Sequence, residues 1–126
     1  REAQENARGV LMVSHDLSAV AGIVDRVYVM YAGLIIERGP VNRVLNEPRH
    51  PYTQMLLDAV PNRERRGTRL NEICGTPPSA GGRPGGCPFS SRCPRVIPRC
   101  RREMPAWTIN ATHGFRCWVP VTDGSL

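Results

Sequence analysis

The sequence contains no lysine, and all 17 of its basic residues are arginine. This absence excludes the phosphate-binding loop of the form Gly-x-x-x-x-Gly-Lys-Ser/Thr, whose lysine contacts the phosphates of a bound nucleotide. Long apolar runs are also missing, and none approaches the roughly 20 residues that would span a bilayer. No basic and then apolar leader opens the chain. We therefore expect no segment that enters or crosses a membrane.

Aromatic residues are scarce, at 6% of the chain, whereas basic residues crowd its second half. Ten arginines lie between Arg63 and Arg102, where the only acidic residues are Glu64 and Glu72. Such a cluster can bind nucleic acid or an anionic membrane surface, or can balance the charge of an anionic cofactor. Because the few aromatic side chains do not alternate with these arginines, nucleic-acid binding is the less favoured interpretation.

Two segments of different composition meet near Pro61. Residues 1–60 carry periodic apolar residues, as packed helices and strands do, whereas residues 61–126 hold most of the prolines and glycines. The polar stretch from Arg1 to Arg8 reads as the end of a helix, which suggests a piece of a longer protein. We expect an α/β unit over residues 1–60, and a small irregular tail over residues 61–126 that is held together by something other than a core.

The first expected unit is a strand, a turn and a helix. Gly9 to Ser14 form a short, nearly continuous apolar run, which is typical of a central strand buried on both faces. His15 and Asp16 follow it, and apolar residues then recur at helical spacing as far as Val24, with Ser14 or Asp16 suited to cap the first turn.

A hairpin and two short helices are expected next. Residues 26–31 are β-branched and aromatic, Ala32 and Gly33 make a tight turn, and residues 34–39 form the returning strand. Pro40 then stands where one helix would begin, and Pro51 opens a second helix that Pro61 ends.

Five cysteines in a chain without a secretion leader favour a metal or cluster site over a disulfide framework. Cys87, Cys93, Cys100 and Cys117 give the pattern C-x5-C-x6-C-x16-C, and four thiolates can hold a 4Fe-4S cluster or a zinc ion. The tight ligand pairs of structural zinc sites are absent, but zinc remains the alternative, followed by two disulfides. Cys74 lies outside the pattern and reads as an ordinary small apolar residue.

Several other residues near these cysteines have simpler interpretations. We expect His50 and His113 to be surface or capping histidines, with His113 the nearer of the two to the cysteines. Trp107 and Trp118 are expected to form a small core around the site. Metal-ligand bonds would supply the folding free energy that a tail rich in proline and glycine cannot obtain from apolar burial.

The segment around His15 resembles the end of the ATPase core of ABC transporters, which is a P-loop NTPase domain. The resemblance rests on Val-Ser-His-Asp-Leu at residues 13–17 and on the Asp-Arg-Val, Met-Tyr-Ala-Gly and Ile-Glu-Arg-Gly pieces between Asp25 and Gly39. It implies that His15 is the switch histidine, which contacts the terminal phosphate of ATP and the attacking water. Without that context, His15 would read as a helix-start residue that contacts its own backbone.

Three further blocks make the chain similar to the ATP-binding subunits of oligopeptide and dipeptide importers. They are residues 50–53 (His-Pro-Tyr-Thr), residues 75–79 (Gly-Thr-Pro-Pro-Ser) and the four-cysteine pattern. The resemblance implies an iron-sulfur cluster on Cys87, Cys93, Cys100 and Cys117, with ATP and Mg²⁺ bound only by the intact subunit. It also implies a second ATPase subunit and membrane permease subunits as partners, at the cytoplasmic side of the membrane. Peptides are the implied cargo, with nickel as a variation; a stand-alone metal-binding module is the alternative function.

The missing phosphate-binding loop generates a first prediction. Because the family's signature motif and catalytic glutamate are absent as well, we expect the purified chain to show no saturable ATP binding in isothermal titration calorimetry and no ATP hydrolysis. Saturable heat of ATP binding by the 126-residue chain would contradict this interpretation.

Overall fold

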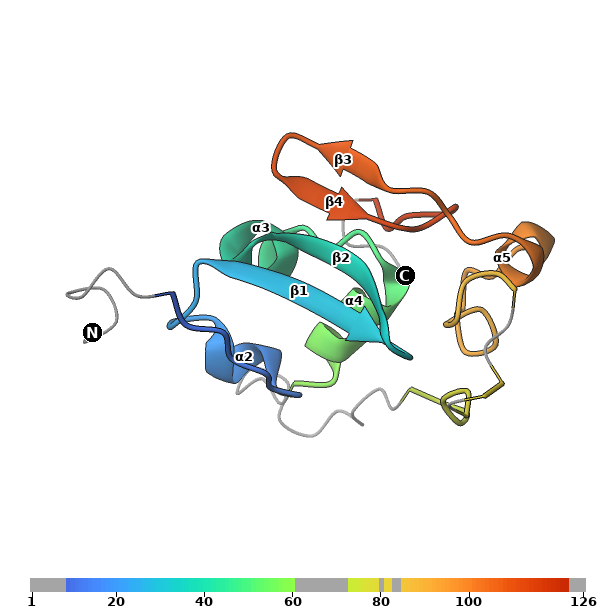
Figure 1. Ribbon diagram of the computed structural model, residues 1–126, viewed down its shortest axis with the longest axis horizontal. Helices are drawn as coiled ribbons and strands as arrows, with labels where there is room; N and C mark the ends of the chain where they lie inside the picture. Colours follow the sequence, from blue (N-terminus) through green and yellow to red (C-terminus); the bar gives the residue numbers. More distant parts are fainter. Residues whose placement is uncertain (1–8, 61–72, 80, 83–84, 123–126) are drawn as a thin grey trace.

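The computed structural model describes residues 9–60, 73–79, 81–82 and 85–122. These residues form a small α/β structure whose strands make one antiparallel sheet, with short helices beside it (Figure 1). None of the helices in these ranges is long and apolar enough to cross a membrane. The architecture agrees with the α/β class expected for the first part of the chain.

The sequence-predicted hairpin is present as β1 (Arg26–Tyr31) and β2 (Leu34–Pro40). Ala32 and Gly33 form its two-residue turn, and both have a positive φ, at 48° and 78°. Two positive φ values give the turn a twist that matches that of the flanking strands, and glycine adopts them without strain. The predicted hairpin is therefore confirmed.

The pairing of the hairpin shifts by one residue along β2. Val29 pairs with Glu37, but the next residue, Met30, pairs with Ile35, which leaves Ile36 as the extra residue of a bulge. A bulge interrupts the alternation of faces along a strand. Ile36 and Glu37 are consequently adjacent in sequence and yet both fully buried.

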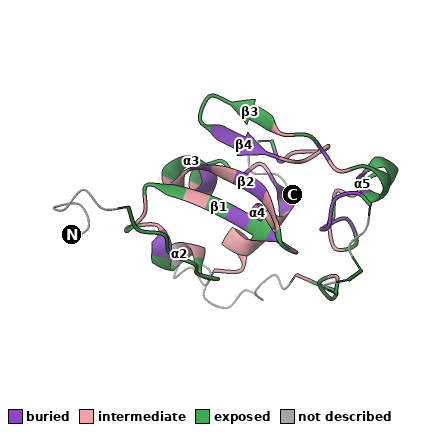
Figure 2. Ribbon diagram, in the orientation of Figure 1, coloured by how far each residue is buried: buried purple, intermediate pink, exposed green. Residues whose placement is uncertain are grey.

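The tail adds two strands to this sheet, contrary to the expectation that it is irregular. β3 (Thr108–Asn110) pairs with β4 (His113–Phe115), and β4 pairs with β2, which gives the order β1-β2-β4-β3. Figure 2 shows β4 buried between its neighbours and β3 exposed at the edge. The tail also contains a helix, α5 (Pro98–Arg102).

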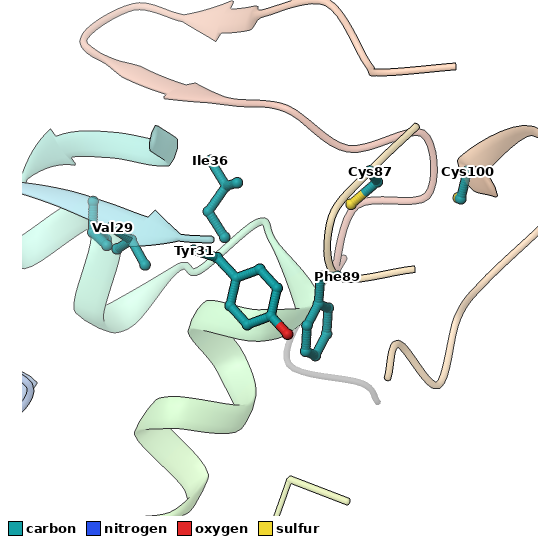
Figure 3. Close-up of a cluster of buried hydrophobic side chains, with 7 residues drawn as sticks. Val29, Tyr31, Ile36, Cys87, Phe89 and Cys100 are labelled. Carbon is teal, nitrogen blue, oxygen red and sulfur yellow. The ribbon is translucent and has the colours of Figure 1, made fainter. Parts of the chain in front are cut away.

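One hydrophobic core joins the two parts of the chain. It combines Val29, Tyr31, Ile36 and Val44 with three residues of the tail, Cys87, Phe89 and Cys100. Figure 3 shows the Phe89 ring beside that of Tyr31, and the two rings meet edge to face with centroids 5.2 Å apart. The expectation of a tail held together without a core is therefore wrong, because local composition does not reveal burial against distant residues.

The two proline-opened helices lie where the sequence predicts them. They are α3 (Val41–Asn46), which buries Val44, and α4 (Pro51–Asp58). The predicted helix after Asp16 is much shorter than expected and spans only Leu17–Val20, as α2. Asp16 caps it, since its Oδ1 accepts from the backbone N–H of Ala19 at 3.2 Å.

The predicted central strand over Gly9–Ser14 is wrong. These residues form no strand and are exposed, with Leu11 at 92% and Val13 at 93% of full exposure. A strand is stable only when a neighbour satisfies its backbone N–H and C=O groups, and the described residues provide no strand that pairs with this one. An apolar run shows that a segment is suited to burial but does not supply its partner.

Glu37 lies at the shared core and needs hydrogen-bond donors there, because its polar side chain is fully buried. Its Oε1 accepts from the backbone N–H of Arg49 at 2.7 Å, and its Oε2 accepts from that of His50 at 2.9 Å. His113 Nε2 lies 2.7 Å from Oε1, and since a carboxylate only accepts, this nitrogen carries the proton. Glu37 thereby joins β2, the start of α4 and β4.

Replacement of Glu37 should lower the free energy of unfolding more than the replacement of an exposed glutamate does. Glu37→Ala leaves two buried donors and one part-buried donor without an acceptor, so we expect a loss of about 3–5 kcal/mol in the free energy of unfolding by urea. The matched control is Glu47→Ala, which removes an exposed pair with Arg43 and should cost at most about 0.5 kcal/mol. Equal losses in the two variants would show that Glu37 does not hold the parts together.

Candidate metal centre

The four cysteines of the predicted pattern line a single cavity. Cys87 and Cys93 belong to the turns before α5, Cys100 lies within α5, and Cys117 follows β4. The cavity is also lined by His50, Arg95 and Trp118. The structure thus gathers residues that are up to 67 positions apart in sequence, from 50 to 117.

Close backbone packing places Cys87 next to α5. The N–H of Cys87 donates to the carbonyl of Cys100 at 2.7 Å. The preceding residue, Gly86, lies so close to this carbonyl that a Cβ atom there would overlap it and would crowd the backbone of Arg101 and Arg102. Only glycine fits at this position without a shift of the chain, so Gly86 sets the approach of two of the cysteines.

Three of the four cysteines that line the cavity have thiols with raised pKa values. Burial is the largest cause that raises the pKa of Cys87, Cys93 and Cys117, to about 12 for Cys117, and nearby cysteines raise each of them further. All five cysteines are free of disulfide bonds. A positive metal centre would reverse these shifts, because it favours the deprotonated sulfur.

The cysteine side chains of the cavity do not converge on a single metal position. Among the described residues, no three side chains of Cys, His, Asp or Glu are arranged as the ligands of a single metal ion. The cysteines share a cavity, but their sulfurs do not form the compact tetrahedron that a zinc site requires.

His50 occupies an unexpected position. It is the N-cap of α4, as a capping histidine would be, and its Nδ1 accepts from the N–H of Tyr52 at 3.1 Å. It is not at the surface, however, because only 1% of it is exposed and its Nε2 lies 3.9 Å from Cys87 Sγ. Burial lowers the pKa of His50 from 6.5 to about 4, although the nearby Glu37 raises it, so the ring is neutral at neutral pH.

His113 is also buried, and it lies on the other side of Glu37. The expectation that it is a surface residue is wrong, as is the expectation that it is the histidine nearer to the cysteines. Its position in β4, between β2 and β3, explains its burial. The turn-like composition of residues 110–114 does not predict a strand there. The pairing of β4 depends on β2, which lies more than 70 residues away in the sequence.

The arginine and tryptophan side chains near the cysteines differ in whether they line the cavity and in what they contact. Of the arginines near the cysteines in sequence, Arg95 lines the cavity, whereas Arg92 donates to the carbonyls of Ile73 and Cys74. Trp118 lines the cavity and has the guanidinium of Arg99 3.6 Å from its ring centroid. The other tryptophan, Trp107, does not line it and lies instead under Arg38, at 4.9 Å.

His15 is exposed in the segment before α2 and is not among the residues that line the cysteine cavity. Its neighbour Asp16 is held by the cap of α2 and by Ser14, whose Oγ accepts from the N–H of Asp16 at 3.0 Å. The chain therefore has two separate candidate sites, the exposed His15 and the cysteine cavity.

Comparison with known proteins assigns the chain. The family described as "Oligopeptide/dipeptide transporter, C-terminal region" matches residues 36–100. The chain belongs to this family. The matched region begins at Ile36, next to Glu37, and ends at Cys100, so it includes His50 and three of the four cysteines of the cavity.

Similar relatives are ATP-binding proteins of peptide transport. The dipeptide transport ATP-binding protein DppD of Bacillus subtilis is 43% identical over 111 residues, which cover 87% of this chain and 33% of that protein. A putative peptide import ATP-binding protein of Brucella ovis is 43% identical over 120 residues, with 90% and 36% covered. The oligopeptide transport ATP-binding protein OppD of Salmonella typhimurium is 40% identical over 114 residues, with 90% and 34% covered. The chain spans about a third of the length of these relatives, and the resemblance seen in the sequence is confirmed.

Proposed function

We propose that this chain is the C-terminal portion of an ATP-binding subunit that powers a peptide importer. Its family, and the dipeptide and oligopeptide transport functions in the names of its relatives, are the observations that carry this proposal. The intact subunit would bind ATP and Mg²⁺, pair with a second ATP-binding subunit, and dock on permease subunits at the cytoplasmic face of the membrane. Peptides are the proposed cargo.

His15 is the residue through which the chain would take part in ATP hydrolysis. Its exposure leaves the imidazole accessible to a nucleotide held by the rest of the subunit. A neutral imidazole can hydrogen-bond a terminal phosphate and the water that attacks it. The chain by itself would remain inactive, since it lacks the phosphate-binding loop.

The cysteine cavity would hold a 4Fe-4S cluster through Cys87, Cys93, Cys100 and Cys117. Four thiols lining one cavity are the donor set that such a cluster requires. Arg95 at the cavity would offset the negative charge of a cluster with four thiolates. Bound there, a cluster would cross-link the turns before α5, α5 itself and the segment after β4.

The cluster is tested by anaerobic reconstitution of the chain with ferrous iron and sulfide. We expect four iron and four sulfide per chain, and a broad visible absorption that is lost in Cys87→Ala, Cys93→Ala, Cys100→Ala and Cys117→Ala. Cys74→Ala is the matched control, because Cys74 is exposed and lies outside the cavity, and it should retain the full cluster. Binding of zinc alone, or equal loss in the Cys74 variant, would show that the proposed cofactor is wrong.

The transport role is tested in a chimaera in which this chain replaces the matching segment of DppD of Bacillus subtilis. We expect the chimaera to support dipeptide import, and His15→Ala to lower import by roughly 10²-fold or more, because the phosphate and water contacts are lost. Glu47→Ala, at the exposed residue directly after α3, serves as the control and should import normally at equal protein abundance. Undiminished import with His15→Ala would remove His15 from the mechanism.

A further inference from the structure

The orientation of the His50 imidazole assigns its proton. Nδ1 accepts the hydrogen bond from the N–H of Tyr52, so the lone pair of this nitrogen is used and its proton must be elsewhere. A neutral ring therefore carries its proton on Nε2. That nitrogen is the one that faces Cys87 Sγ, at 3.9 Å, within the reach of an N–H···S hydrogen bond.

Three contacts hold the ring in this orientation. Glu37 fixes the backbone of His50 from one side, Tyr52 fixes Nδ1, and the ring of Phe89 packs against the imidazole with centroids 6.0 Å apart. With 1% of the residue exposed, the ring has no space to turn toward solvent. His50 is thus a preoriented donor on the wall of the cysteine cavity.

The same contacts make His50 unsuited to be a metal ligand itself. To ligate through Nε2, the ring would have to move its proton to Nδ1, and the N–H of Tyr52 would then face another N–H at the start of α4. Ligation by His50 would therefore remove the N-cap hydrogen bond of α4. The geometry favours a role beside the cluster over a place in it.

We propose that the Nε2–H of His50 donates a hydrogen bond to the sulfur of Cys87 when that sulfur ligates the cluster, and that this bond makes the reduction potential of the cluster less negative. The inference rests on the proposed cluster and adds a residue outside its four ligands. A hydrogen bond to a ligand sulfur withdraws negative charge from it, and this favours the state that has one more electron. The hydrogen bond that Nδ1 accepts from the N–H of Tyr52 supports the role, because it keeps the proton of the ring on the donor nitrogen.

The test is a dithionite titration of the reconstituted chain, in which dithionite supplies the one electron that each cluster takes up. His50→Asn keeps an oxygen that can cap α4 but is too short to reach Cys87, and we expect its midpoint potential to shift to a more negative value. His113→Asn is the matched control. Like His50, His113 is buried and hydrogen-bonded to Glu37, but it does not line the cavity. The control should keep the potential of the unaltered chain at equal iron and sulfide content.

A second measurement does not depend on the stability of any variant. Pulsed electron paramagnetic resonance of the reduced, unaltered chain with ¹⁵N-labelled histidine should show a weak nitrogen coupling and an exchangeable proton close to the cluster. A strong coupling, as from a bound nitrogen, would overturn the proposal in favour of ligation, and no coupling would overturn it outright. An unchanged potential in His50→Asn with an intact cluster would refute this inference alone, whereas failure of the unaltered chain to assemble any cluster would refute the proposed cofactor and this inference with it.

Discussion

The carboxylate of Glu37 imposes the constraint on which the rest of the structure depends. A fully buried carboxylate is stable only when its oxygens accept enough hydrogen bonds, and here the donors come from the backbone at Arg49 and His50 and from the ring of His113. These donors lie 12 to 76 residues from Glu37 along the chain. Satisfying one side chain therefore requires the hairpin, the start of α4 and the tail strand β4 to be in place together.

The geometry of the cysteine cavity follows from this constraint. Glu37 fixes the backbone at His50, and the ring of His50 then reaches the sulfur of Cys87. Phe89, two residues after Cys87, packs against Tyr31 at the end of β1. The turn that carries Cys87 is thus anchored to the hairpin by side-chain packing, and a metal centre would add cross-links to a tail that shares a core with the first segment.

What the sequence predicted correctly is local. The Ala32-Gly33 turn and the helices that begin near Pro40 and Pro51 each depend on residues close together in the chain. Two of the errors are non-local: the apolar run at residues 9–14 has no strand beside it in the described part of the chain, and β4 pairs with a strand that composition does not reveal. A third error is local, because the helix predicted after Asp16 ends already at Val20. The burial of His50 and His113 had one available signal, a single glutamate within the otherwise apolar start of β2, since a buried carboxylate needs donors.

The structural unit is longer than the region matched by the family. The match over residues 36–100 includes Glu37, His50 and Cys87 but leaves out His113 and Cys117. Both omitted residues come from β4 or the segment directly after it, and β4 is held on β2 by backbone pairing opposite Glu37 and Arg38. The hairpin of β3 and β4 therefore belongs to the same structural unit as the matched region, because it supplies one hydrogen bond to the buried carboxylate and leads directly into Cys117, which lines the cysteine cavity.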